Sequence, residues 1–112
     1  MILTSKERVD IIIAAAEEVK AEDIQTVELI GKTLIADYFV IATGRTNVQA
    51  RAIADRILER CRESGYKKVQ DEGYREAQWI VLDYGDVIVH VMQPEQREYY
   101  SIEDLWKNFV RE

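Results

Sequence analysis

The chain has 112 residues and a mass of 13.0 kDa, which is the size of one domain. Hydrophobic residues make up 47% and charged residues 32%, a balance typical of globular chains and not of disordered ones. The formal net charge is −6, and no cluster of lysines and arginines is present to bind a phosphate backbone. These values argue against nucleic acid as the main ligand and favour a neutral or basic protein surface as the partner.

Cys61 is the only cysteine, which excludes an intrachain disulfide and a zinc site made of four cysteines. Its place in a helical pattern is typical of a small buried hydrophobe. The first residues carry charges from Lys6 onward and lack the apolar segment of a signal peptide. No apolar run approaches the ~20 residues of a membrane helix. We therefore expect a cytoplasmic protein without a membrane segment.

A helix is predicted near the N-terminus, where apolar residues recur with a period of 3.6 over residues 9–19. Thr4 and Glu7 have the spacing of a capping box, in which each side chain bonds the other residue's free backbone N–H. Ile11 lies off the apolar stripe. Two interpretations of it stay open, an isolated exposed residue or a contact in a homo-oligomer.

Two strands and a second helix are predicted next. Alternating polarity indicates an outer strand over residues 24–30, and the continuous apolar centre of residues 37–44 indicates a strand covered on both faces. Thr46 and Gln49 have the spacing of a second helix start, and Gly65 is typical of a helix end.

The C-terminal half predicts a short strand near residues 67–70, then a hairpin of residues 79–83 and 87–92, after which Pro94 ends the second strand. Ser101 begins a last helix, with Asp104 three positions on and an apolar stripe of Ile102, Leu105, Trp106, Phe109 and Val110. The element order α-β-β-α-β-β-β-α predicts one α/β domain over residues 1–112, with a mixed sheet flanked by helices.

The two faces of the predicted hairpin differ in chemistry. A turn at residues 84–85 pairs Trp79 with His90 and places only apolar residues on the core side. The opposite face holds Trp79, Val81, Asp83, Ile88, His90 and Met92. Two interpretations stay open for this face. It is a protein-binding surface with aromatic and Met anchors, or the last helix covers it and His90 is a structural residue.

No constellation for catalysis or for metal binding is found in the sequence. His90 is the only histidine, without an H-x-x-x-H or H-x-E pattern. Asp83 and Asp86 flank a turn, where acidic side chains are usually solvated or bonded to backbone. The loop at residues 43–47 has one glycine and lacks the patterns of a phosphate-binding loop. We therefore predict no catalytic residue, no cofactor and no metal.

Two long segments resemble the ribosomal silencing factor family, also called RsfS or Iojap. They are DYFVIATGRTNVQARAIADRI (37–57) and WIVLDYGDVIVHVMQPEQREYYSIEDLW (79–106), and the resemblance extends in order over nearly the whole chain. It implies an α/β fold similar to a minimal nucleotidyltransferase fold, without enzymatic activity. It also implies binding to large-subunit ribosomal protein number fourteen on the free large subunit. That binding blocks small-subunit joining and represses translation when nutrients are scarce. Members often crystallise as homodimers, which implies a homodimer here.

The resemblance carries over individual residues. The family's Trp-x-x-x-Asp falls on Trp79 and Asp83, its strand histidine on His90, and its Arg-x-x-Tyr on Arg97 and Tyr100. It implies aromatic anchors at Trp79 and Tyr100, and orienting hydrogen-bond groups at Asp83 and His90. Arg97 is either a partner contact or a brace. With Met92 from the family and Val81 from the hairpin face, the predicted partner-binding set is Trp79, Val81, Asp83, His90, Met92, Arg97 and Tyr100.

Two alternative functions stay open. A nucleotidyltransferase-like enzyme would use Asp83, Asp86 and a metal ion, but it needs a Gly-Ser loop followed by an Asp-x-Asp strand, which the sequence lacks. A large-subunit assembly factor would bind the same particle as a silencing factor. A subunit-joining assay with mature particles separates those two functions.

Overall fold

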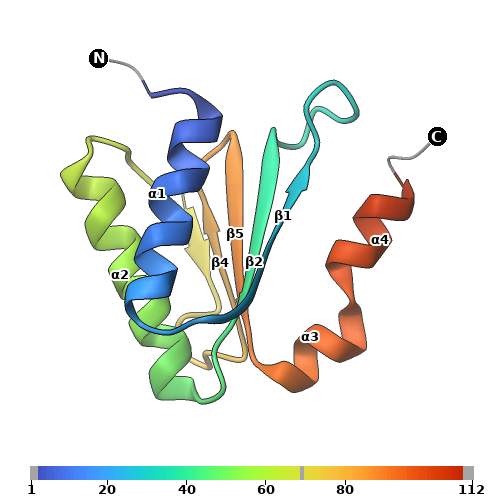
Figure 1. Cartoon of the computed structure of the whole chain (residues 1–112). Helices are drawn as coiled ribbons and strands as arrows, with labels where there is room; N and C mark the ends of the chain where they lie inside the picture. The colour runs from blue at the N-terminus through green and yellow to red at the C-terminus, as the bar shows by residue number, and fades with distance from the viewer. Residues whose placement is uncertain (1–2, 69, 110–112) are drawn as a thin grey trace.

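A five-stranded mixed sheet separates two pairs of helices in the computed structural model, which describes residues 3–68 and 70–109, the side chains of 106–109 excepted (Figure 1). The elements are α1 (Ser5–Glu18), β1 (Glu22–Glu28), β2 (Tyr38–Thr43), α2 (Asn47–Glu63), β3 (Gln70–Glu72), β4 (Trp79–Asp83), β5 (Val87–Met92), α3 (Pro94–Tyr100) and α4 (Ile102–Phe109). The strand order is β1-β2-β5-β4-β3, with β2 and β5 parallel and all other neighbours antiparallel. The predicted α/β class and mixed sheet are confirmed.

Both predicted helix starts are confirmed by their caps. At α1 the Thr4 hydroxyl accepts from the Glu7 amide at 3.1 Å, and the Glu7 carboxylate accepts from the Thr4 amide at 2.8 Å. At α2 the Thr46 hydroxyl accepts from the Gln49 amide at 3.0 Å. The Gln49 side chain, however, accepts from the Arg45 amide, one residue before the cap. These bonds satisfy backbone donors that a helix start leaves free.

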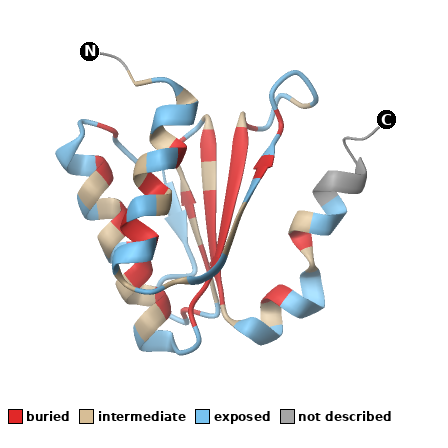
Figure 2. Cartoon of the chain, viewed as in Figure 1, coloured by how far each residue is buried: buried red, intermediate tan, exposed pale blue. Residues whose placement is uncertain are grey.

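The main core lies between the sheet and the helices α1 and α2. Figure 2 shows buried residues along the inner sides of these helices and along the central strands. All six residues of β2 are buried, which confirms the strand covered on both faces. Cys61 is fully buried in this core, and its burial raises the pKa of the thiol to about 11. Ile11 is half-buried against the same core rather than exposed.

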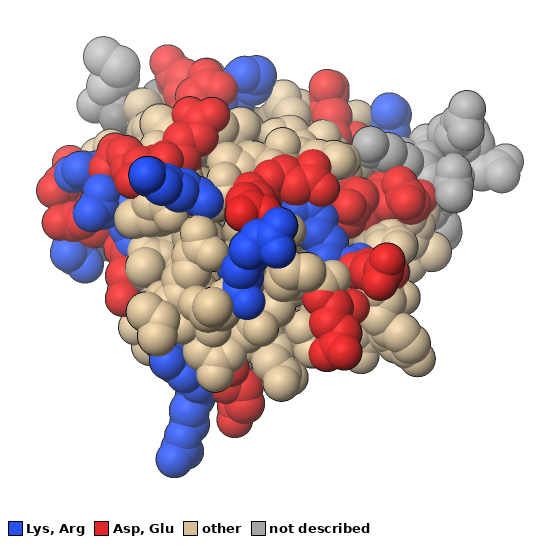
Figure 3. Space-filling model, turned by 60° about the horizontal axis from the view of Figure 1, so that its bottom comes forward, with Lys and Arg blue, Asp and Glu red and all other residues tan. Residues whose placement is uncertain are grey.

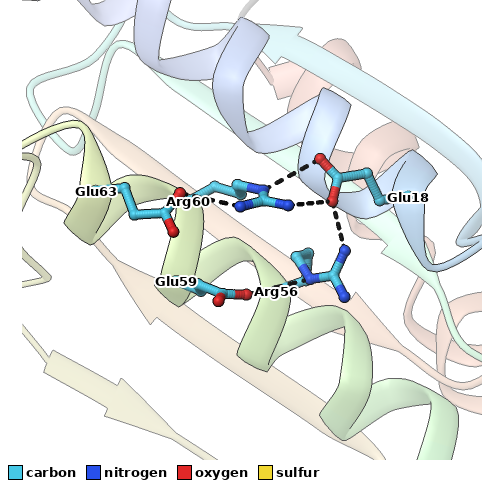
Figure 4. A network of polar contacts seen from close by, with 5 residues as sticks. All are labelled: Glu18, Arg56, Glu59, Arg60 and Glu63. Carbon is cyan, nitrogen blue, oxygen red and sulfur yellow. Dashed lines mark hydrogen bonds and ion pairs between the residues drawn. The ribbon is translucent and has the colours of Figure 1, made fainter.

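A charged network fixes α1 against α2 on their outer side (Figure 4). Glu18 accepts hydrogen bonds from Arg60 and Arg56, and these bonds hold the pKa of its carboxyl group below the ordinary value. Glu63 and Glu59 each pair with one of the two arginines within α2. Because these pairs are open to solvent, each contributes little to the stability of the fold.

The hairpin strands have the predicted bounds, but the predicted turn at residues 84–85 is wrong by one residue. The Tyr84 amide donates to the Val87 carbonyl at 2.9 Å, so the tip lies one residue further along the chain. Trp79 therefore pairs with Met92, two positions from its predicted partner. A shift of two positions preserves the alternation of side chains, and the predicted assignment of residues to the two faces is confirmed.

Helix α3 is the element that the sequence did not predict. Pro94 ends β5 as expected, but it then occupies the first turn of a helix, where its missing N–H and fixed φ are tolerated. The helix ends at Ser101, which has a left-handed backbone with φ 44°. The Asp104 amide donates to the Ser101 backbone carbonyl at 3.1 Å, while the Ser101 hydroxyl donates to the Glu98 carbonyl at 2.9 Å, so the predicted side-chain cap on α4 is wrong.

Helix α4 follows directly and keeps only part of its predicted inward stripe. Ile102 is buried, whereas Leu105 is 61% exposed, which contradicts its predicted inward position. Helix α4 packs near β1 at the edge of the sheet, and among its described side chains only Ile102 is buried. The predictions for Trp106, Phe109 and Val110 lie outside the described side chains.

Candidate partner-binding face

Strand alternation places the predicted residues on the sheet face opposite α1 and α2, which we call the hairpin face. It consists of Trp79, Val81, Asp83, Ile88, His90 and Met92. Residues 80, 82, 87, 89 and 91 point into the main core instead. Helices α3 and α4 lie on the hairpin-face side of the sheet (Figure 1). Their position decides how much of the face is open to a partner.

The hairpin face has a covered half, which holds the buried His90 and Met92, and an open half of half-buried residues. Met92 is fully buried in a second core that includes Ile41 and Ile102 of α4, and His90 is 8% exposed. Trp79, Val81, Asp83 and Ile88 remain half-buried. The interpretation that the last helix covers this face is therefore right at Met92, whereas the open half stays a predicted partner-binding surface. The expectation of an open face is wrong at His90 and Met92, because Ile102 of the last helix packs in one core with Met92 and the rings of Phe39 and Trp79 lie against His90.

A hydrogen bond joins the open and covered halves. Trp79 Nε1 donates to His90 Nδ1 at 3.1 Å, so this imidazole nitrogen carries no proton and the ring is neutral, with its proton on Nε2. Burial lowers the pKa of His90 to about 4, which keeps the ring neutral at physiological pH. His90 Nε2 is buried without a hydrogen-bond partner in the described part of the chain. The residue therefore orients the Trp79 indole from below the surface.

Aromatic rings continue from this pair to the surface. The Phe39 and His90 rings meet edge to face at 4.9 Å between centroids, and Trp79 lies 4.9 Å from Tyr100. Tyr100 in turn meets Tyr99 at 4.9 Å. Exposure rises along the line to 49% at Tyr100 and 80% at Tyr99. The sequence does not place Tyr99 in the partner-binding set, yet it is the most exposed ring of this line.

Arg97 is a brace in this structure. Its side chain is buried, and Nη1 donates to Thr43 Oγ1 at 2.8 Å while Nε donates to Glu103 Oε2 at 3.1 Å. These bonds tie α3 to the end of β2 and to the start of α4. Of the two interpretations left open by the sequence, the structure supports the brace, which holds the C-terminal helices on the sheet.

Charges of both signs surround Arg97 at the carboxyl ends of β2 and β5. A cleft of about 330 Å³ lies there, lined by Glu22, Asp23, Thr43, Arg45, Pro94, Arg97, Glu98, Ser101 and Glu103. Acidic and basic groups interleave on the underside of the molecule (Figure 3).

Among the described residues, no group of three or more His, Cys, Asp or Glu side chains could hold a metal ion. None of the described helices is long and apolar enough to cross a membrane.

A family model described as "Ribosomal silencing factor during starvation" matches residues 2–112. This chain belongs to the ribosomal silencing factor family. The Bacillus subtilis ribosomal silencing factor RsfS is 39% identical over 104 residues, which cover 93% of this chain and 88% of the relative. The crystal structure of a Chromobacterium violaceum protein superposes with a TM-score of 0.91 at 35% identity, covering 94% of this chain and 88% of that chain.

More distant similarity reaches an organellar protein. Mouse "Mitochondrial assembly of ribosomal large subunit protein 1" is 29% identical over 103 residues, which cover 88% of this chain and 44% of the mouse protein. Membership in the ribosomal silencing factor family associates this chain with the ribosome and with the regulation of translation. The predicted family is therefore confirmed, and the relatives are named as regulators rather than as enzymes.

Proposed function

We propose that this ribosomal silencing factor binds large-subunit ribosomal protein number fourteen on the free large subunit. Its bulk then blocks the small subunit, and translation is repressed in the cytoplasm under nutrient limitation, without catalysis. The observation that carries the proposal is the open half of the hairpin face, with Trp79, Val81 and Asp83, extended by Tyr100 of α3. Half-buried aromatic rings beside polar groups are typical of residues that dominate protein interfaces.

The residues that contact Trp79 are consistent with the same function. Trp79 is held by the buried His90 and lies against Tyr100, so its orientation is set before a partner arrives. Such preorganisation reduces the entropy lost on binding. The net charge of −6 attracts a basic ribosomal protein, which raises the association rate and makes it sensitive to salt. A steric block needs only a stable contact, since no bond is made or broken.

The test is co-sedimentation of the protein with purified large subunits. Trp79→Glu is expected to abolish binding, because an unpaired carboxylate in an apolar interface is costly to bury. Val48→Glu is the matched control, since Val48 is 74% exposed on α2, away from the hairpin face. Tyr100→Glu is a second variant, in case Trp79→Glu disturbs the fold; melting temperatures report folding. Normal binding by both folded variants would contradict the proposed site.

Assembly of the large subunit is a second candidate function. The name of the mouse relative favours it, because that protein is named for assembly of the mitochondrial large subunit. An assembly factor acts on immature particles, whereas a silencing factor inhibits joining of mature subunits. The predicted homodimer stays a separate prediction, and the mass of the protein in solution tests it.

A further inference from the structure

The loop between β1 and β2 presents aliphatic side chains to solvent. Leu34 is fully exposed, Ile35 is 51% exposed and Ile30 is 46% exposed. In Figure 1 this loop projects beyond the ends of the strands that it joins. Exposed aliphatic side chains gathered on one loop are a feature of interaction sites.

The backbone of the loop is held in a defined shape. Leu29 is fully buried in the second core, and its carbonyl accepts from the amides of Lys32 at 2.9 Å and Thr33 at 3.3 Å. Ala36 is buried at the other end of the loop. Because both ends are anchored in the core, the tip presents Leu34 and Ile35 outward in a fixed place.

Hydrogen bonding joins the loop to the hairpin. The Asp37 amide donates to the Asp86 carbonyl at 2.7 Å, which ties the loop's end to the β4–β5 turn. Residues 31–37 and Gly85 of that turn together line a depression of about 540 Å³. Asp83 and Ile88, which pair across the hairpin next to this turn, are half-buried members of the hairpin face. The loop therefore borders the open half of that face.

Area and charge decide between a second copy and another partner. Three aliphatic side chains fall far short of the roughly 800 Å² that each partner buries in a stable complex, so the loop alone cannot hold a homodimer. The net charge of −6 also favours a basic partner over a second acidic copy as the occupant of the loop. A basic partner that also covers the hairpin face buries more area than the loop alone, and its charge is opposite to that of this chain.

We propose that Leu34 and Ile35 form a second apolar contact for the partner that binds the hairpin face. The partner is a basic protein surface of the large subunit, with an apolar patch that receives the loop and basic groups that face Asp37 and Asp83. This inference rests on the proposed function. It adds an anchor at the opposite end of the strands from Trp79 and Tyr100, which lengthens the proposed interface.

The test measures the affinity for purified large subunits of a double variant, Leu34→Ser with Ile35→Ser. Both side chains are exposed, so the melting temperature is expected to stay unchanged. The dissociation constant is expected to rise at least about tenfold, because two apolar side chains lose their burial in the complex. Val48→Ser is the matched control, an exposed aliphatic residue on α2 whose loss is expected to leave affinity unchanged.

The outcomes separate this inference from the proposed function. Unchanged affinity of the double variant, with binding lost in Trp79→Glu, would overturn the loop contact and leave the proposed function standing. Failure of the unaltered protein to bind would overturn the proposed function. A double variant that binds subunits normally but changes from dimer to monomer by light scattering would assign the loop to a second copy and overturn the inference.

Discussion

Trp79 Nε1 lies 3.1 Å from His90 Nδ1, and this bond ties a half-exposed indole on β4 to a buried imidazole on β5. The two residues are diagonal neighbours on the antiparallel ladder, because Trp79 pairs with Met92 and His90 pairs with Val81. The buried His90 therefore helps to set the orientation of Trp79, which belongs to the proposed interface. A substitution at His90 is therefore expected to change both the stability of the fold and the orientation of Trp79 at the surface.

The stability of the fold is expected to depend on pH through His90. Burial lowers the pKa of His90 to about 4 from an ordinary value of 6.5, so between these values the unfolded state binds more protons. The free energy of unfolding is therefore expected to fall as the pH falls, by about 2 kcal/mol from about pH 7 to about pH 5. Urea denaturation at the two pH values measures this change.

His90→Gln isolates that contribution from the carboxylates. Glutamine keeps an acceptor for the Trp79 indole but does not titrate in this range. Its free energy of unfolding is expected to change less between the two pH values than that of the unaltered protein. Equal pH dependence in both proteins would show that His90 is not the group responsible.

Arg97→Met tests the brace. The substitution leaves the Glu103 carboxylate without its main partner in a largely buried place, and we expect a loss of about 3 kcal/mol in unfolding free energy. Arg45→Met is the control, because the Arg45–Glu22 pair is exposed and its removal is expected to leave the urea midpoint unchanged. An equally small effect of both variants would contradict the role of Arg97.

Gly73→Ala tests the entry to β4. Gly73 has φ +82°, and a Cβ atom there would lie 2.1 Å from the Trp79 carbonyl oxygen. Gly65 has φ +77° with no neighbour within 4 Å, so Gly65→Ala is expected to cost only about 1 kcal/mol. Gly73→Ala is expected to cost at least about 2 kcal/mol more and to weaken subunit binding, since Trp79 must move. Equal melting temperatures of the two variants would refute this.

The Cys61 thiol is expected to be inert in the folded protein. Its burial is complete, and its pKa of about 11 leaves little thiolate at about pH 8. A thiol reagent should react with it only after urea unfolds the chain. Rapid labelling of the native protein would contradict the buried position.

The strands and faces of the hairpin were predictable from the sequence, whereas its register was predicted incorrectly. Alternating polarity predicted both strands with their correct bounds and their faces. The register was wrong by two positions because the turn was placed one residue early. A glycine at the first of two loop positions is typical of a type II′ turn, and Gly85, with φ +88°, occupies that position. That signal was available in the sequence.

The cover over the hairpin face was not predictable in the same way. The sequence predicts only a strand end at Pro94, although proline is also favoured in the first turn of a helix, where the structure places it. The contact that brings α3 onto the sheet joins Arg97 to Thr43, 54 positions apart in the chain. Local periodicity carries no information on such a contact. The division of the face into open and buried halves therefore required the structure.

The most direct test of the central claim is a subunit-joining assay with purified mature subunits. The unaltered protein, added to the large subunit first, is expected to reduce the fraction of joined particles in a density gradient in proportion to its binding. The folded Trp79→Glu variant is expected to leave joining unchanged. Normal joining in the presence of a saturating amount of the unaltered protein would contradict the account.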